Sequence, residues 1–279
     1  MSNPEERLQN FWNGKIQEIY DQFIAELDRK PKYCELCEVS FHRGTPNYAS
    51  VVQQQLYLLR YFSAYLFEYF EAFNVLNDQI DEHINIVSFG CGSGIDGAAA
   101  ECVFPTCSYR GVDITQWDYW FPNGDYEIES ASDFIPTNEN VFVFPKSLNE
   151  FPPYVVERLA VNLPRTSAQN ICIINSKRNI NDTDGCLRIV RSFGRIYNHY
   201  IINSERNALC IYHNWFSYPD NVKNHVENIS ASCPLCQRKE KACCKYGGDI
   251  CRGNIPKPMD WRIVLRDTNF LTDVYLIQR

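Results

Sequence analysis

Apolar residues recur at helical spacing through the first eighty positions and predict two long helices. The first begins after Asn3, which can cap a helix that has Pro4 at its first position. Its apolar positions are Leu8, Phe11, Trp12, Ile16, Ile19, Phe23 and Leu27. The second covers about 49–76 and has aromatic residues nearly all round it. A helix of this kind is expected to be buried between layers.

From residue 84 the pattern changes to short apolar runs that alternate with helical segments. The expected strands are 84–89, 109–112, 141–144 and 170–174, and the expected helices are 95–103, 154–162 and 183–197. This alternation predicts an α/β fold with a mostly parallel sheet and helices on both faces.

After residue 200 the pattern predicts antiparallel hairpins in place of further crossovers. The expected pairs are 200–203 with 209–212, and 261–266 with 270–278. The sequence thus predicts a helical N-terminal extension over 1–83 and one α/β domain over 84–279. That domain ends in an antiparallel hairpin and contains a small cysteine-rich insert at 231–257.

Composition and charge narrow the class of protein. The chain of 279 residues is 45% hydrophobic, which suffices for a substantial core, and its net charge of −7 argues against non-specific coating of nucleic acid. No apolar run reaches the length of about 20 residues that a membrane span needs. The first residues lack the basic and apolar regions of a signal peptide. We therefore expect an intracellular, cytoplasmic protein without a membrane segment.

A run of alternating glycines follows the first expected strand. Gly90, Gly92 and Gly94 allow a sharp turn and a close approach of the backbone to a ligand. The helix that follows directs its free N–H groups toward the same place. Asp113 ends the next expected strand. A carboxylate at about this distance along the chain from the glycines accepts hydrogen bonds from ribose hydroxyls.

Two ligand classes fit this segment. Counting Gly92, Gly94 and Gly97 gives G-x-G-x-x-G, the dinucleotide fingerprint of nicotinamide enzymes. Counting from Gly90 gives G-x-G-x-G, which resembles the first motif of the class I S-adenosylmethionine-dependent methyltransferases, a Rossmann-like family. The helical segment before the first strand and the expected C-terminal hairpin favour the methyltransferase resemblance, which extends over roughly 84–175.

The resemblance implies roles for individual residues. Cofactor-binding positions would be Gly90, Cys91, Gly92, Ser93, Gly94, Asp113, Ile114 and Asp133. The loop after the fourth strand would line the methyl-transfer site with Lys146, Ser147, Asn149 and Glu150, the candidate catalytic residues. One departure is Phe89, which stands where the family often has an acid for the methionine end of the cofactor. Asp96 is a possible replacement from the start of the helix.

Thirteen cysteines in an intracellular chain indicate a metal site. Cys233 and Cys236 form one C-x-x-C pair and Cys34 and Cys37 another, the spacing at which two thiolates bind one Zn²⁺ ion. A local site would join Cys233 and Cys236 to Cys251 and to Cys244 or Cys243. The alternative joins the two pairs to each other. Zinc is the expected metal, and an iron–sulfur cluster is the less favoured possibility.

The cysteine-rich insert is also locally basic. Between 233 and 257 six lysines and arginines stand against two acidic residues, so the insert is a possible contact for an RNA or protein substrate. The sequence therefore predicts an S-adenosylmethionine-dependent methyltransferase with an unidentified acceptor. The alternatives are an NAD-dependent oxidoreductase, and a non-catalytic, metal-stabilised module that binds RNA or protein.

Overall fold

The computed structural model describes residues 3–29, 48, 51–77, 79–80, 83–177, 184–203 and 271–279. The chain divides into two compact units. One unit comprises Met1–Leu8, Ala64–Leu209 and Thr268–Arg279, and the other comprises Gln9–Ser63 and Cys210–Asp267. Within the described residues, no helix has the length and apolar character required to cross a membrane.

Two long helices open the chain, as expected. Helix α1 covers Pro4–Arg29, and its Glu6 N–H donates to Asn3 Oδ1 over 2.7 Å, which confirms the predicted cap. Helix α3 covers Val51–Asn77. In the smaller unit the two helices pack through apolar side chains, and Trp12 Nε1 donates to Ser63 Oγ over 2.7 Å inside that contact.

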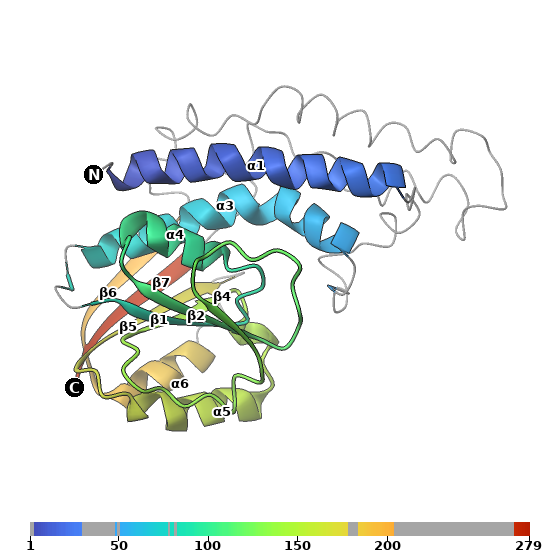
Figure 1. The fold of residues 1–279 in the computed structure, drawn as a ribbon. Coiled ribbons are helices and arrows are strands. Elements are labelled where there is room, and N and C mark those ends of the chain that lie inside the picture. The colour runs from blue at the N-terminus through green and yellow to red at the C-terminus, as the bar shows by residue number, and fades with distance from the viewer. Residues whose placement is uncertain are drawn as a thin grey trace. The chain divides into compact units, whose positions relative to one another are not determined.

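The larger unit is built on one seven-stranded sheet (Figure 1). Its strands are β1 (Asn85–Phe89), β2 (Ser108–Asp113), β3 (Asp125–Ile128), β4 (Val141–Pro145), β5 (Asn170–Lys177), β6 (Arg195–Asn203) and β7 (Leu271–Gln278). They lie in the order β3-β2-β1-β4-β5-β7-β6. The first five strands are parallel to their neighbours, and β7 runs antiparallel between β5 and β6.

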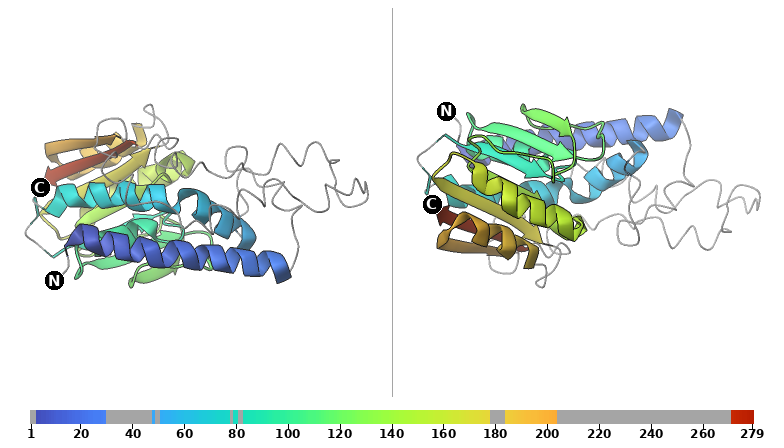
Figure 2. Two further views of the ribbon diagram at one scale, coloured as in Figure 1. Left: turned by 90° about the horizontal axis from the view of Figure 1, so that it is seen from above. Right: turned by 90° about the horizontal axis from the view of Figure 1, so that it is seen from below.

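Helices cover both faces of this sheet. The second half of α3 and α4 (Ile95–Val103) lie on one face, and α5 (Pro153–Asn162) and α6 (Asp184–Phe193) lie on the other (Figure 1). Seen from below, α5 runs across its face of the sheet (Figure 2). Short 3-10 turns occur at Leu148–Glu150 and Leu163–Arg165. The predicted fold class is confirmed: a Rossmann-like, mostly parallel sheet with helices on both faces and antiparallel strands at the C-terminal side.

Two expected elements were wrong in extent. The helix expected over 183–197 ends at Phe193, because Gly194 takes a positive φ of 144° and the chain continues as β6. The strand expected from residue 200 therefore starts at Arg195. β6 pairs with β7, while the partner segments 209–212 and 261–266 of the expected hairpins lie outside the described residues.

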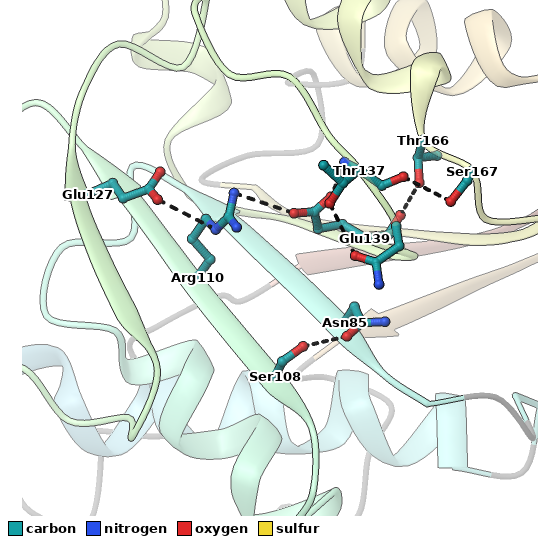
Figure 3. Close-up of polar contacts among 9 residues, drawn as sticks. Asn85, Ser108, Arg110, Glu127, Thr137, Glu139, Thr166 and Ser167 are labelled. Atoms are coloured by element: carbon teal, nitrogen blue, oxygen red, sulfur yellow. Dashed lines mark hydrogen bonds and ion pairs between the residues drawn. The ribbon is translucent and has the colours of Figure 1, made fainter.

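A polar network ties together the side of the sheet that contains β2, β3 and the start of β4 (Figure 3). The Arg110 guanidinium lies 3.6 Å from Glu127 Oε1 and 3.5 Å from Glu139 Oε1. Glu139 is buried and accepts the Thr137 N–H over 2.6 Å. Thr166 Oγ1 donates to the Glu139 carbonyl over 2.7 Å. These contacts join β2, β3 and the segment that leads into β4.

Candidate functional site

The strand order places a change of direction between β1 and β4. The chain leaves β1 toward β2 on one side, and β4 lies on the other side of β1. In open α/β sheets a ligand binds at the carboxyl ends of the strands at such a switch point. Two loops meet there: the glycine turn at 90–94 and the loop at 146–150.

The glycine turn has the backbone conformation that its sequence predicts. Gly90, Gly92 and Gly94 have φ values of 70°, 57° and 73°, a region that residues with a side chain rarely adopt. The Gly90 N–H donates to the Val112 carbonyl over 2.7 Å, which holds the turn against the end of β2. Gly94 then precedes the first residue of α4, so the N-terminus of that helix opens from the turn.

Asp113 lies at the end of β2 in direct contact with this turn. Its Oδ2 accepts the Gly92 N–H over 2.9 Å, and its Oδ1 accepts the Thr115 N–H over 2.9 Å. Burial raises the pKa of the Asp113 carboxyl, as does the negative charge of Glu150, while the backbone donors oppose the rise. Each carboxylate oxygen has a further lone pair, so this group can accept hydrogen bonds from a diol.

Side chains from two loops pack against the glycines. A Cβ on Gly90 would lie 2.5 Å from Ser147 Cβ, and one on Gly92 would lie 3.3 Å from the Trp117 ring. A Cβ on Gly94 would lie 2.7 Å from Pro122. The turn therefore requires small residues both for its conformation and for its surroundings. The sequence pattern alone did not indicate Trp117 or Pro122, since both belong to the loop after β2.

The remaining cofactor positions differ in exposure. Ser93 is 1% exposed, and its hydroxyl has no hydrogen-bond partner among the residues that the structure describes. Cys91 is buried, and burial raises the pKa of its thiol, which makes it a poor nucleophile. Ile114 is 78% exposed beside Asp113, an unusual amount for an apolar residue next to a buried turn. Asp133 is exposed in the loop before β4.

The loop after β4 separates the four candidate catalytic residues into two pairs. Lys146 is buried, has a φ of 58°, and places its Nζ 3.0 Å from Glu68 Oε2. Ser147 is buried, and its hydroxyl donates to the Phe89 carbonyl over 2.5 Å. Asn149 and Glu150 are exposed. Of the four, these last two have side chains open to an acceptor.

Asp96 does not take the place of the missing acid. It is 1% exposed, and both of its oxygens accept from the Tyr109 hydroxyl, at 3.1 and 3.0 Å. Burial raises the pKa of Asp96 from 3.8 to about 6. Its carboxyl therefore belongs to the contact between α4 and β2. Phe89, at the position where the acid was expected, is buried and stacks on Phe144.

A buried polar cluster surrounds Lys146, which the residue patterns did not indicate. Glu68 on α3 is fully buried and accepts from Ser176 on β5 and Thr272 on β7, as well as from the lysine. A usable signal was present, because Glu68 is a carboxylate inside an apolar helix rich in aromatic residues. A charge in that setting requires a partner.

The expected metal ligands Cys34, Cys37, Cys233, Cys236, Cys243, Cys244 and Cys251 all lie outside the described residues. Over the part of the chain that the structure describes, no group of three or more His, Cys, Asp or Glu residues is arranged to hold a metal ion. Among the described cysteines, Cys91, Cys102, Cys172 and Cys186 are buried free thiols, and Cys107 is a partly buried one.

Comparison with known proteins finds similar structures only. No family model matches the chain, and no curated protein matches it. The plantazolicin methyltransferase BpumL, solved with S-adenosylhomocysteine and a monoazolic desmethylPZN analogue, is 14% identical over 95% of this chain and 98% of that chain, with a TM-score of 0.40. A phosphoethanolamine N-methyltransferase from Haemonchus contortus is 11% identical over 84% of this chain and 60% of that chain, with a TM-score of 0.40. At these TM-scores the likeness carries no weight for the function of this chain.

Proposed function

We propose that the chain is an S-adenosylmethionine-dependent methyltransferase whose acceptor binds at the carboxyl ends of β1 and β4. A fold does not assign an activity by itself, so the proposal depends on the site. The observation that carries it is the contact between the glycine turn and Asp113, the 2.9 Å hydrogen bond from the Gly92 N–H to Asp113 Oδ2 at the switch point of the sheet.

The strand order favours S-adenosylmethionine over a nicotinamide dinucleotide. The dinucleotide fold has the order 3-2-1-4-5-6. Here the antiparallel β7 lies between β5 and β6, at the C-terminal end of the chain, where many methyltransferases have a hairpin. One local feature fits the dinucleotide spacing: Gly97 on α4 lies against the Tyr109 ring, which a Cβ would approach to 2.6 Å. That glycine serves helix packing, and close packing of this kind suits either ligand.

In the proposed site each group of residues has one task. The backbone of Gly90 to Gly94 would hold the methionine end, Asp113 the ribose hydroxyls, and Ile114 and Asp133 the adenine region. The bound cofactor supplies an activated methyl group on a sulfonium sulfur. The protein positions the acceptor, and Asn149 and Glu150 are the exposed side chains beside that position. Glu150 is the candidate to take up a proton from the acceptor.

Calorimetric titration tests this proposal. The purified chain should bind S-adenosylmethionine in the micromolar range. Asp113→Ala should weaken the binding at least about tenfold, because the two hydrogen bonds that the ribose hydroxyls would donate to the Asp113 carboxylate are lost. Asp118→Ala, a carboxylate in the loop that follows β2, is the control and should bind as the wild type does. Binding of NADH without binding of S-adenosylmethionine would favour the oxidoreductase alternative.

We extend the proposal to the cysteine-rich insert, which would bind zinc and contact the acceptor. Zinc bound by Cys233, Cys236, Cys251 and Cys243 or Cys244 would stabilise 231–257, and the basic residues there would contact an RNA or protein acceptor. The non-catalytic alternative predicts weak or absent cofactor binding. It also predicts that no S-adenosylhomocysteine forms with any cellular extract.

A further inference from the structure

The turn after β4 has a conformation that its own sequence does not favour. Lys146 has a φ of 58°, the only positive φ among the described residues other than glycine. A left-handed conformation costs a residue with a side chain about 1–2 kcal/mol, so other contacts must hold it. The Lys146 N–H donates back to the Phe144 carbonyl over 2.9 Å, which bends the chain sharply at Pro145.

The side chain of Lys146 supplies those contacts. Its Nζ lies 3.1 and 3.0 Å from the two oxygens of Glu68, and it donates to Ser176 Oγ over 2.8 Å. It also lies 3.3 Å from the Lys177 carbonyl and 5.0 Å from the centre of the Tyr65 ring. The ammonium is thus surrounded by partners from α3 and β5.

Glu68 is fixed as firmly as the lysine it binds. Its side chain is 0% exposed, and its Oε1 accepts from Ser176 Oγ over 2.6 Å and from Thr272 Oγ1 over 2.5 Å. Ser176 on β5 and Thr272 on β7 therefore fix the Glu68 carboxylate, and this carboxylate in turn binds Lys146. A buried pair of this kind specifies one arrangement, because leaving either charge alone in the interior is costly.

The ion pair between Glu68 and Lys146 affects the position of the next four residues, 147–150. Ser147 follows Lys146, donates to the Phe89 carbonyl, and has its Cβ 2.5 Å from where a Gly90 side chain would begin. The Glu150 N–H donates to the Ser147 carbonyl over 2.8 Å and closes the short turn that leaves Asn149 and Glu150 exposed. The packing of Ser147 against the glycine turn thus depends on the backbone conformation at Lys146. The direction in which Asn149 and Glu150 point depends on it as well.

We propose that Glu68 is a positioning residue that acts through its ion pair with Lys146. The pair holds the left-handed turn after β4, which packs Ser147 against Gly90 and presents Asn149 and Glu150 to the acceptor. Lys146 itself is an anchor and does not contact the acceptor. This inference rests on the proposed function, because its effect is expressed on the S-adenosylmethionine site.

Two double variants separate this role from ordinary packing. Glu68→Gln with Lys146→Met removes both charges and leaves a residue that disfavours the left-handed turn. Glu68→Gln with Lys146→Gly removes the same charges, but glycine adopts that turn without cost. The binding of S-adenosylmethionine should weaken about tenfold in the methionine variant, the factor that corresponds to the cost of a left-handed residue. It should stay within about threefold of wild type in the glycine variant.

A matched control lies on the opposite face of the same sheet. The side chains of Lys177 and Asp273 form a buried pair at 2.5 Å. The contact of Lys177 with Lys146 is made by its backbone carbonyl, which Lys177→Met retains. Lys177→Met with Asp273→Asn should leave binding within about twofold of wild type. Equal binding by the methionine and glycine variants, or an equal loss in the control, would overturn the inference.

Hydrogen exchange of the ligand-free protein gives a readout that does not need the cofactor. The amides of Ser147 to Phe151 should exchange faster in the methionine variant than in the wild type or the glycine variant. If the wild type bound no S-adenosylmethionine, the proposed function would fail, and this exchange pattern would still decide whether Glu68 holds the turn. Identical exchange in all three proteins would contradict the positioning role.

Discussion

At Gly90 both the backbone conformation and the neighbouring atoms exclude a side chain. Its φ is 70°, and a Cβ would lie 2.5 Å from Ser147 Cβ. Gly90→Ala should therefore lower the free energy of unfolding by about 1–2 kcal/mol or more and weaken the binding of S-adenosylmethionine. Chemical denaturation and calorimetry measure the two effects.

The same substitution at Gly14 is the control. Gly14 lies within α1, and a Cβ there would have no heavy atom within 4 Å. Gly14→Ala should raise the free energy of unfolding by up to about 1 kcal/mol, because alanine favours the helix. Opposite signs at the two positions are the expected result, and equal signs would refute the account of the turn.

Asp96 makes stability depend on pH. Burial raises its pKa from 3.8 to about 6 in the folded chain, so the folded state binds more protons than the unfolded state between these values. Stability should therefore fall as pH rises from about 4 to about 6. Asp96→Asn lacks this titration and can still accept from Tyr109. Its stability relative to wild type should increase over that window by about 3 kcal/mol. Urea unfolding at pH 4, 5, 6 and 7 tests this, and a constant difference would contradict it.

Residue patterns predicted the glycine turn and its contact with Asp113 better than the contacts of the loop after β4. Gly90, Gly92 and Asp113 were found because spacing along one strand–turn–helix unit reveals them, and the structure places the turn and the carboxylate in contact. Glu68 and Thr272 were missed because their contacts join positions far apart in the sequence: Glu68 binds Lys146, and Thr272 donates to Glu68. Local spacing holds no information about such contacts.

At the scale of elements, strongly patterned segments were predicted closely and weakly patterned ones were not. The cap at Asn3 and the apolar strands β1, β4 and β5 follow from local sequence. β3 was not predicted, because it is an edge strand of only four residues with no buried residue, too short for its alternation of polar and apolar residues to indicate a strand. The predicted helix extended past Gly194 because apolar residues continue on both sides of that glycine. In the structure α6 ends at Phe193, since Gly194 takes a positive φ.

The pairing of β5 with β7 contains a second testable ion pair. Lys177 Nζ lies 2.5 Å from Asp273 Oδ2, and both side chains are almost fully buried. Asp273→Asn alone should lower the free energy of unfolding by about 3–5 kcal/mol, because it leaves the ammonium unpaired. The double variant with Lys177→Met should recover most of that loss. Thermal unfolding measures both, and a double variant less stable than the single one would be the contrary result.

At the scale of the whole molecule, the position of β7 could not be predicted from pattern alone. Its residues, Leu271–Gln278, are apolar enough to predict a strand, but their partners Asn170–Lys177 lie about a hundred residues earlier in the chain. Alternation of strands and helices predicted the parallel part of the sheet. The insertion of one antiparallel strand between β5 and β6 is set by packing between distant segments.

The cysteine clusters give a prediction for the intact chain. The purified protein should contain about one zinc ion per chain, bound through Cys233 and Cys236. Cys233→Ser with Cys236→Ser should abolish the zinc content, whereas Cys172→Ala, at a buried cysteine of β5, should retain it. Elemental analysis by mass spectrometry measures this. Zinc retained by the double serine variant would show that other residues bind it.

Binding of S-adenosylmethionine by the glycine turn and Asp113 can be observed in a native mass spectrum of the freshly purified chain, recorded with and without added cofactor. The predicted spectrum shows one molecule of S-adenosylmethionine or S-adenosylhomocysteine per chain in the wild type, and a much smaller bound fraction in Asp113→Ala. A chain that takes up a nicotinamide dinucleotide and leaves added S-adenosylmethionine unbound would contradict it.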